Sequence, residues 1–235
     1  GNAVEPADSP ILKSKISVLN TDDVEAFLTR VRTSIPIFEG INSLMLREMM
    51  VEADVHSCSA GDVVFEKNDY TNSFYVVLDG SVAVLIDEKD PDKQISIGAG
   101  NYFGEMGLIS GRRRTATIKA ESSCTLIEIP RRTMIKVRGN SPEVREALDR
   151  EAAIRQIQTY IAPNTPRADL VDIASSSQIK SYKMGETLFS EGDGADSLHL
   201  IRKGSVSVAK RLGGRSVVLN YVAAGNYVGE MGLIS

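Results

Sequence analysis

Two nearly identical stretches contain the residue types and spacing that could bind a ligand. GNYFGEMGLIS occupies positions 100–110, and GNYVGEMGLIS occupies positions 225–235. The two copies differ at one position, where Phe103 of the first corresponds to Val228 of the second. The repetition raises the question of what this glycine-rich segment does.

The first copy predicts an anion-binding turn. A strand is expected to end near Tyr102, and Gly104 permits a tight backbone and close approach of a ligand. The residues after Gly104 can form one short helical turn that Gly111 would end. The free N–H groups at the start of such a turn form a site for an anion.

The residues around this turn indicate a sugar phosphate. Arg112, Arg113 and Arg114 follow it, and a guanidinium binds phosphate oxygens through two parallel hydrogen bonds. Glu105 would repel a bare phosphate, so its presence favours a ligand that also offers a hydroxyl, as a ribose does. Together these residues predict a compact sugar-phosphate pocket.

Other motifs do not indicate chemistry. GAGNYF (98–103) lacks the third glycine of a dinucleotide-binding loop, and a strand rather than a long helix is expected soon after it. RVRTSI (30–35) resembles a kinase-substrate site but lies on the amphipathic face of a predicted helix. The cysteines and histidines have no metal-binding or catalytic spacing: Cys58, Cys124, His56 and His199. We therefore expect no metal, no cofactor and no catalytic centre.

The duplication extends well beyond the glycine-rich stretch. Eight residues of the first half recur 124 positions later. In the first half they are Gly61, Phe65, Asp69, Ser73, Gly80, Ser81, Val82 and Val84. Their counterparts are Gly185, Phe189, Asp193, Ser197, Gly204, Ser205, Val206 and Val208. From Gly100 onward the displacement is 125, so one residue was added between Val208 and Gly225, and a hairpin loop is its expected place. A period this long indicates a duplicated domain.

Each half reads as a series of short strands. Strands are expected in DVVFEK and ETLFSE, in the runs on either side of Asp79-Gly80 and Lys203-Gly204, and in QISIGAG, RTATIKA and CTLIEI. We interpret the two glycine steps as hairpins and EKDPDK (88–93) as a polar turn. This many short strands predicts a β-roll or jelly roll in each half.

Helices are expected to flank the strands. Val24, Phe27, Leu28 and Val31 form one face of a helix over 21–35. A second helix is expected over 41–53. Residues 141–162 predict a third, with Ser141 as its cap. The expected fold class is therefore mainly β with flanking helices, in two tandem rolls.

The pattern FGE-x-x-L, five residues, then R-T-A-T resembles the phosphate-binding cassette of cyclic-nucleotide-binding domains. The resemblance covers nearly the whole chain from about residue 23, and the tandem arrangement is similar to that of protein kinase A regulatory subunits. It implies cyclic AMP or cyclic GMP as the ligand. It also implies that the helix over 141–162 acts as a hinge and lid.

The resemblance implies a role for each cassette residue. Gly104, Met106 and Gly107 would contact the phosphate through their backbone, Glu105 would accept from the ribose 2′-hydroxyl, and Arg114 would bind the phosphate. Arg113 is the alternative to Arg114, with Arg112 and Arg113 otherwise solvated. Thr115 stands where kinase A-like cassettes have alanine and cyclic-GMP kinases have threonine. Cyclic AMP is slightly favoured because bacterial and kinase A-like sensors usually bind it, and Thr115 favours the other nucleotide.

A second site is possible in the second copy. There Gly229, Glu230, Met231 and Gly232 match the cassette, and its arginine would lie four positions past Ser235. Because a roll without its last strands exposes unpaired edges, we expect the second roll to be incomplete and the native chain to continue for at least about 20 residues.

The composition sets the remaining expectations. The 235 residues are 42% apolar, carry a net charge of −4 and contain two cysteines. The lack of a basic surplus argues against direct nucleic-acid binding, and no apolar run approaches the roughly 18 residues of a membrane helix. Two cysteines are too few for a disulfide scaffold, which favours a cytoplasmic protein.

The expected organisation has four parts. They are an N-terminal tail (1–22), a first cyclic-nucleotide-binding domain (23–140), a connecting hinge helix and linker (141–166) and a second domain (167–235). The leading hypothesis is a sensor that is not an enzyme and that signals to a protein effector or a downstream domain. Two alternatives are the regulatory fragment of an enzyme whose catalytic domain lies elsewhere, and a degenerate roll used only for assembly. Glu105 and Arg114 argue against the last.

Overall fold

The computed structural model describes residues 12–15, 21–70, 73–85, 93–110, 113–162, 164–194 and 197–229. The chain divides into two compact units, Gly1–Leu148 and Asp149–Ser235. Among the helices of these described residues, none has the length and apolar character needed to cross a membrane.

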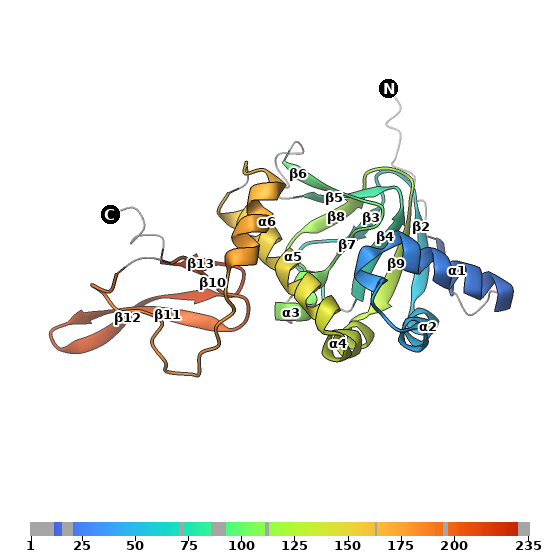
Figure 1. Cartoon of the computed structure of the whole chain (residues 1–235). Helices are drawn as coiled ribbons and strands as arrows, with labels where there is room; N and C mark the ends of the chain where they lie inside the picture. Colours follow the sequence, from blue (N-terminus) through green and yellow to red (C-terminus); the bar gives the residue numbers. More distant parts are fainter. Residues whose placement is uncertain are drawn as a thin grey trace, which may run out of the picture. The chain divides into compact units, whose positions relative to one another are not determined.

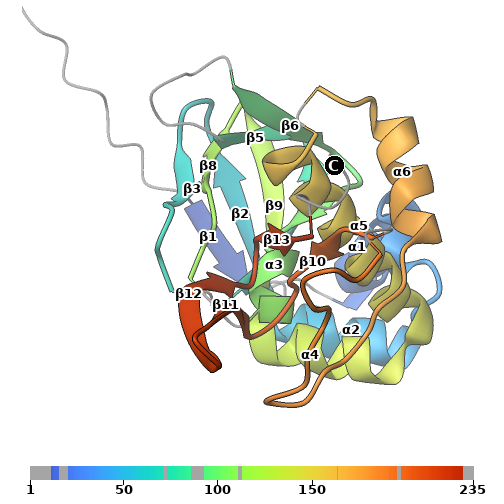
Figure 2. The same ribbon diagram turned by 90° about the vertical axis from the view of Figure 1, so that its left-hand side faces the viewer.

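Two antiparallel sheets form the roll of the first unit (Figure 1, Figure 2). The five-stranded sheet has the order β1 (Leu12–Lys15), β2 (Asp54–Cys58), β9 (Cys124–Pro130), β4 (Ser73–Asp79) and β7 (Tyr102–Phe103). The four-stranded sheet has the order β3 (Val63–Phe65), β8 (Thr117–Ala120), β5 (Ser81–Leu85) and β6 (Gln94–Gly98). The predicted β-roll is confirmed.

The Asp79-Gly80 step is not the hairpin that the sequence predicts. β4 pairs with β7 and β9, whereas β5 pairs with β6 and β8, so this step carries the chain from one sheet to the other. Gly80 has a φ of +74°, and a Cβ there would lie 2.3 Å from the carbonyl oxygen of Ser123. Glycine is needed because two backbones meet closely at this corner, a long-range contact that imitates a turn signal in the local sequence.

Helices pack on the five-stranded sheet. They are α1 (Thr21–Ser34), the short η2 (Pro36–Phe38), α2 (Ser43–Glu52), α4 (Arg131–Asn140) and the first part of α5 (Pro142–Tyr160). In both views α2 and α4 lie side by side beneath the roll, at the end away from β5 and β6 (Figure 1, Figure 2). The predicted face of α1 is confirmed, since Leu28 and Val31 are buried and Val24 and Phe27 pack beside them.

Two apolar cores result in the first unit. One lies between the helices and the five-stranded sheet and contains Phe38, Leu46, Ile127 and Met134. The other fills the interior of the roll. It contains residues of both sheets, among them Tyr75, Val82, Phe103 and Ile118.

The predicted cap of the α5 helix is present. Ser141 Oγ accepts a hydrogen bond of 3.4 Å from the backbone N–H of Val144. Val144 and Leu148 join the helical core of the first unit. Within the second unit, Ile154 and Ile157 pack against Leu170 of α6 (Arg167–Ser176).

The second unit contains two antiparallel ribbons in its described residues. β10 (His199–Leu200) pairs with β13 (Tyr227–Val228), and β11 (Ser205–Leu212) pairs with β12 (Arg215–Ala223). Lys203-Gly204 is therefore also a step between ribbons and not the predicted hairpin. The tight hairpin is instead at Gly213-Gly214, between Leu212 and Arg215.

The strand register locates the added residue. Ser205 faces Ala223 and Val208 faces Asn220, the same pairing as Ser81 with Gly98 and Val84 with Ile95 in the first roll. Beyond Val208 the register shifts at a bulge. The insertion therefore lies between Val208 and Asn220, where the shift leaves Leu219 as an extra residue within β12, and not in the predicted hairpin loop.

Several elements differ from the sequence-based expectation. β1 lies in the expected N-terminal tail, and α4 and α6 are helices that were not predicted. ETLFSE (186–191) forms no strand. In α4, Thr133, Met134 and Val137 are buried with helical spacing, a signal that the sequence does contain.

Candidate functional site

The site begins where β7 ends. Gly104 has a φ of +88°, and a Cβ on it would lie 2.9 Å from Nη1 of Arg114 and 3.2 Å from the carbonyl oxygen of Ser73. The short helix α3 (Glu105–Ser110) follows at once, and the predicted turn is confirmed. Gly111, its expected end, lies outside the described residues. The missing side chain of Gly104 is thus what allows the Arg114 guanidinium to reach this backbone.

A loop after β3 holds the backbone of Arg114. The N–H of Arg114 donates to the carbonyl of Asp69 and its own carbonyl accepts from Asn68, both at 2.9 Å. The Asp69 carboxylate in turn accepts from the N–H of Glu66 at 2.9 Å, which closes the loop as a turn. Arg114 is therefore fixed at both backbone groups before its side chain makes any contact.

The Arg114 side chain is buried against aromatic rings. It is 7% exposed, and its guanidinium carbon lies 4.0 Å from the ring centre of Phe65 and 5.5 Å from that of Tyr75. Among the described residues, Nε and Nη1 of Arg114 have no hydrogen-bond partner. A buried guanidinium normally satisfies its donors, so the Nε and Nη1 groups of Arg114 are able to donate to the acceptors of a ligand.

The electrostatics of Arg114 agree with this arrangement. Burial lowers the pKa of the guanidinium. The groups that oppose the shift and favour the charged form are Tyr75, Glu128, Asp69 and Glu105. Since an arginine stays protonated even when its pKa falls, the site keeps a positive charge in a poorly solvated position, where an anion is attracted strongly.

Arg113 has a different environment. It is exposed, its guanidinium stacks 4.0 Å above the ring of Tyr70, and Nη1 donates to the carbonyl of Asn68 at 2.8 Å. Of the two candidate arginines, only Arg114 points to Gly104. Arg112 lies outside the described residues.

The other predicted cassette residues surround the same turn. Glu105 is 1% exposed and Gly107 is also buried, whereas Met106 is half-buried. The N–H of Gly107 donates to the carbonyl of Gly104 at 3.2 Å. Thr115 is exposed, next to Arg114 on the rim.

The second unit repeats part of this geometry. Gly229 has a φ of +101°, and a Cβ there would lie 2.9 Å from the carbonyl oxygen of Ser197, the counterpart of Ser73. The Asp193 carboxylate accepts from the N–H of Ser190 at 2.7 Å, as Asp69 does from Glu66. Glu230, Met231 and Gly232 lie outside the described residues.

A polar cluster behind the cassette was not predicted from the sequence. The Glu128 carboxylate of β9 accepts from Ser73 Oγ and from the Tyr75 hydroxyl at 3.0 Å, and it lies 2.7 Å from Nε2 of His56. The hydrogen bond from His56 is the main reason that the pKa of Glu128 falls to about 2. A glutamate between Ile127 and Ile129 in a predicted strand is the signal that could have marked it.

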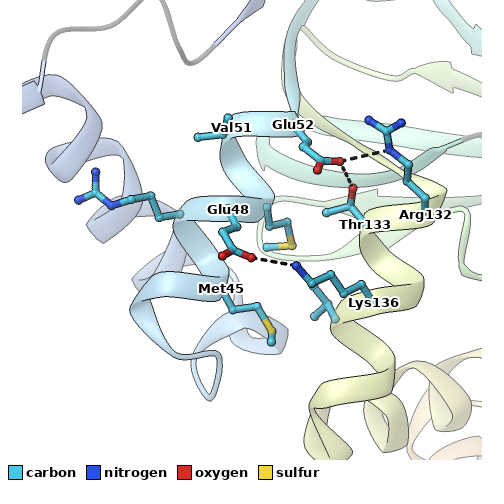
Figure 3. A pocket seen from close by; sticks show the side chains of 10 residues that line it. Met45, Glu48, Val51, Glu52, Arg132, Thr133 and Lys136 are labelled. Atoms are coloured by element: carbon cyan, nitrogen blue, oxygen red, sulfur yellow. Dashed lines mark hydrogen bonds and ion pairs between the residues drawn. The ribbon is translucent and has the colours of Figure 1, made fainter.

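A separate hollow of about 650 Å³ lies between α2 and α4 (Figure 3). Glu48 of α2 pairs with Lys136 of α4 at 3.0 Å, and Glu52 accepts from Thr133 and, at 3.3 Å, from Arg132. The hollow contains none of the predicted ligand-binding residues. Two acids of the hollow already pair with bases across it, whereas Nε and Nη1 of Arg114 have no partner among the described residues.

A family model described as "Cyclic nucleotide-binding domain" matches residues 55–140 and 179–235, more than half of the chain. The chain belongs to the cyclic nucleotide-binding domain family. The first of the two matches contains the entire cassette from Gly104 to Thr115. The second match is shorter and includes the glycine-rich stretch of the second copy.

Relatives of this chain include kinase regulatory subunits and a channel. The chain is 26% identical over 220 residues to a cAMP-dependent protein kinase type II regulatory subunit of Drosophila melanogaster, covering 92% of this chain and 55% of the relative. A cyclic nucleotide-gated potassium channel of Rhizobium etli is 30% identical over 123 residues, which are 52% of this chain and 34% of the channel. The chain spans about half the length of the curated kinase regulatory subunits it matches.

Among solved structures, the regulatory domain of Toxoplasma gondii PKA with cAMP is 19% identical. The match covers 92% of this chain and 82% of that one, with a TM-score of 0.45.

Proposed function

We propose that the first roll binds a cyclic nucleotide and that the chain is a regulatory module without catalytic activity. The observation that carries the proposal is Arg114, a buried cation whose Nε and Nη1 have no partner among the described residues and whose guanidinium faces Gly104. Family membership and the names of the relatives, which include regulatory subunits, support the same function.

In this proposal different residues of the cassette bind different parts of the nucleotide. Arg114 binds the cyclic phosphate, together with backbone groups of Gly104, Met106 and Gly107. Glu105 accepts from the ribose hydroxyl. Both charges are already in place in a site shielded from water, where a charge-assisted hydrogen bond is worth more than at the surface.

The same residues offer a route from the ligand to the helices. Arg131 of α4 donates from Nε to the carbonyl of Gly107 at 3.3 Å, and Tyr102 of β7 donates to the carbonyl of Ala147 in α5 at 3.2 Å. Leu108 of α3 is buried in the same apolar cluster as Val137 and Leu148. A ligand that hydrogen-bonds the cassette backbone would therefore shift the preferred positions of α4 and α5.

The effector and the domain boundaries remain part of the proposal. We propose the division 1–22, 23–140, 141–166 and 167–235, in which β1 of the first segment joins the sheet of the first domain and 141–166 is the hinge to a partner protein or a downstream domain. Gly229 to Gly232 would be a second nucleotide site. Both cysteines are free thiols, which supports a reducing compartment such as the cytoplasm.

The experiment is a calorimetric titration of the chain with cyclic AMP and with cyclic GMP. We expect saturable binding of at least one of them, with cyclic AMP slightly favoured. Adenosine 5′-monophosphate is the control, because it carries the same base and sugar without the cyclic phosphate. No binding of either cyclic nucleotide would contradict the proposal.

A further inference from the structure

The function proposed above gives no role to a polar cluster behind the cassette, which consists of His56, Ser73, Tyr75 and Glu128. The cluster crosses three neighbouring strands of the five-stranded sheet, since β9 lies between β2 and β4. Tyr75 faces Glu128 directly in the strand register. Such a cluster inside a roll is unusual, because a carboxylate loses much of its hydration there and needs donors in return.

Two hydroxyl groups donate to this carboxylate, those of Ser73 and Tyr75, and Nε2 of His56 lies 2.7 Å from it. Burial, followed by the charge of Glu128, raises the pKa of Tyr75, so its hydroxyl stays protonated and donates. Glu128 is therefore a fixed anion that holds the Tyr75 ring by its hydroxyl end.

The Tyr75 ring is part of the wall on which Arg114 lies. It stacks on Phe103 with ring centres 5.1 Å apart and planes 5° from parallel, and it touches Phe65 at 5.7 Å. The Arg114 guanidinium lies over Phe65 at 4.0 Å and over Tyr75 at 5.5 Å. Phe103 directly precedes Gly104, so the same stack also supports the start of the cassette.

Ser73 makes a second connection. Its hydroxyl donates to Glu128, while its carbonyl oxygen is 3.2 Å from the place a Cβ of Gly104 would occupy, beside Nη1 of Arg114. One carboxylate thus holds the two residues of β4 that border the guanidinium and the glycine.

We propose that Glu128 is a positioning residue of the nucleotide site, which holds Tyr75 and Ser73 so that Arg114 lies in the orientation that receives the phosphate. This inference rests on the proposed function. The plainer alternative is that the cluster only satisfies polar groups in the core. The proposal and this alternative predict different nucleotide affinities for variants of the cluster when the same amount of folded protein is titrated. Only the proposal predicts that the affinity falls.

The experiment compares three variants of the chain, Glu128→Gln, Tyr75→Phe and the double variant, by calorimetry with cyclic AMP and cyclic GMP. Glu52→Gln is the matched control, because the Glu52 pKa is also lowered, chiefly by its hydrogen bond from Thr133, and it lies in the α2–α4 hollow away from the cassette. Unfolding midpoints are measured in parallel so that all titrations use folded protein.

We expect Glu128→Gln and Tyr75→Phe each to weaken binding about three- to tenfold, the loss of one positioning hydrogen bond. Because Glu128 acts through Tyr75, the double variant should bind no more weakly than Glu128→Gln alone, whereas independent effects would multiply. Glu52→Gln should bind like the wild type.

Unchanged affinity in Tyr75→Phe and Glu128→Gln, with a wild type that binds, would overturn the inference and leave the proposed function intact. Multiplying effects in the double variant would also overturn it. If Glu128→Gln does not fold, Tyr75→Phe alone decides, since it removes one oxygen and keeps the ring. A wild type that binds neither nucleotide would instead refute the proposed function itself.

Discussion

At the scale of single residues, the adjacent Arg113 and Arg114 have opposite surroundings. Arg113 is exposed and engaged with Tyr70 and Asn68, whereas Arg114 is buried beside Gly104. The difference arises from the loop 66–70, which clamps the backbone of Arg114 and directs its side chain inward. A register of one residue therefore decides which cation is available to a phosphate.

Arg114→Leu is expected to weaken cyclic-nucleotide binding about a hundredfold or more, because a charge-assisted bond is lost and the phosphate is left unpaired. The fold should persist, since leucine suits the ring surfaces of Phe65 and Tyr75. Calorimetric titration measures the change. Arg113→Leu is the matched control and should change affinity less than threefold; a reversal of the two results would place the phosphate contact at Arg113.

Thr115→Ala tests nucleotide preference. The Thr115 side chain is exposed and directly follows Arg114 in the chain, and in the proposed complex its hydroxyl would hydrogen-bond guanine or the phosphate. We expect the substitution to weaken cyclic GMP more than cyclic AMP, by about fivefold, the value of one neutral hydrogen bond. Competition of the two nucleotides against one fluorescent analogue measures the ratio. An equal loss for both would mean that the hydroxyl does not discriminate between the bases.

At the scale of elements, the connection from β7 to α3 depends on backbone geometry. Gly104 and Gly61 both have a positive φ, at +88° and +95°. They differ in surroundings, because a Cβ at Gly104 would meet Arg114 and Ser73, whereas nothing lies within 4 Å of a Cβ at Gly61. Substitutions at the two glycines therefore distinguish two effects. Both introduce backbone strain, and only the one at Gly104 also displaces the Arg114 guanidinium.

Gly104→Ala and Gly61→Ala are each expected to lower the free energy of unfolding by about 1 kcal/mol or more, because alanine is strained at positive φ. Only Gly104→Ala should also weaken nucleotide binding, since its methyl group must push Nη1 of Arg114 aside. Denaturant unfolding and calorimetry on the same samples give the two quantities. Equal affinities in both variants would show that the contact with Arg114 is unimportant.

At the scale of the whole molecule, the half-buried Glu128 makes the stability of the protein depend on pH. The pKa of Glu128 is about 2 in the folded protein, against an ordinary value of 4.5. The unfolded chain therefore binds the proton more readily. The stabilisation by Glu128 is complete above about pH 5 and is lost as the pH falls from 4.5 towards 2.

The free energy of unfolding of the wild type should accordingly exceed that of Glu128→Gln at pH 6, and the gap should shrink steadily between pH 5 and pH 3. Urea unfolding at several pH values checks the sign. Glu143→Gln is a useful control, because its pKa is also lowered but it lies fully at the surface at the start of α5. A gap that widens on acidification would contradict the assignment of Glu128 as the anion.

The sequence by itself determined the features that depend on local patterns. The duplicated cassette, most of the strands, the buried face of α1, the Ser141 cap of α5 and the glycine turn at Gly104 could all be predicted. They follow from residue periodicity, capping and the conformational freedom of glycine, which act over a few residues. The resemblance to a nucleotide cassette was carried by the same short segment.

Only the tertiary structure decided which distant residues meet. The Asp79-Gly80 step, which the local sequence predicts as a hairpin, is a corner between the two sheets. The glycine is required there because the backbone of Ser123 approaches it closely, and not because of a local turn. The tertiary structure also places Arg114, and not Arg113, beside Gly104, with Tyr75, Glu128 and His56 behind it from strands separated by many positions along the chain. Such contacts depend on sheet order and register, which local periodicity does not specify because many strand orders satisfy the same alternation of apolar residues.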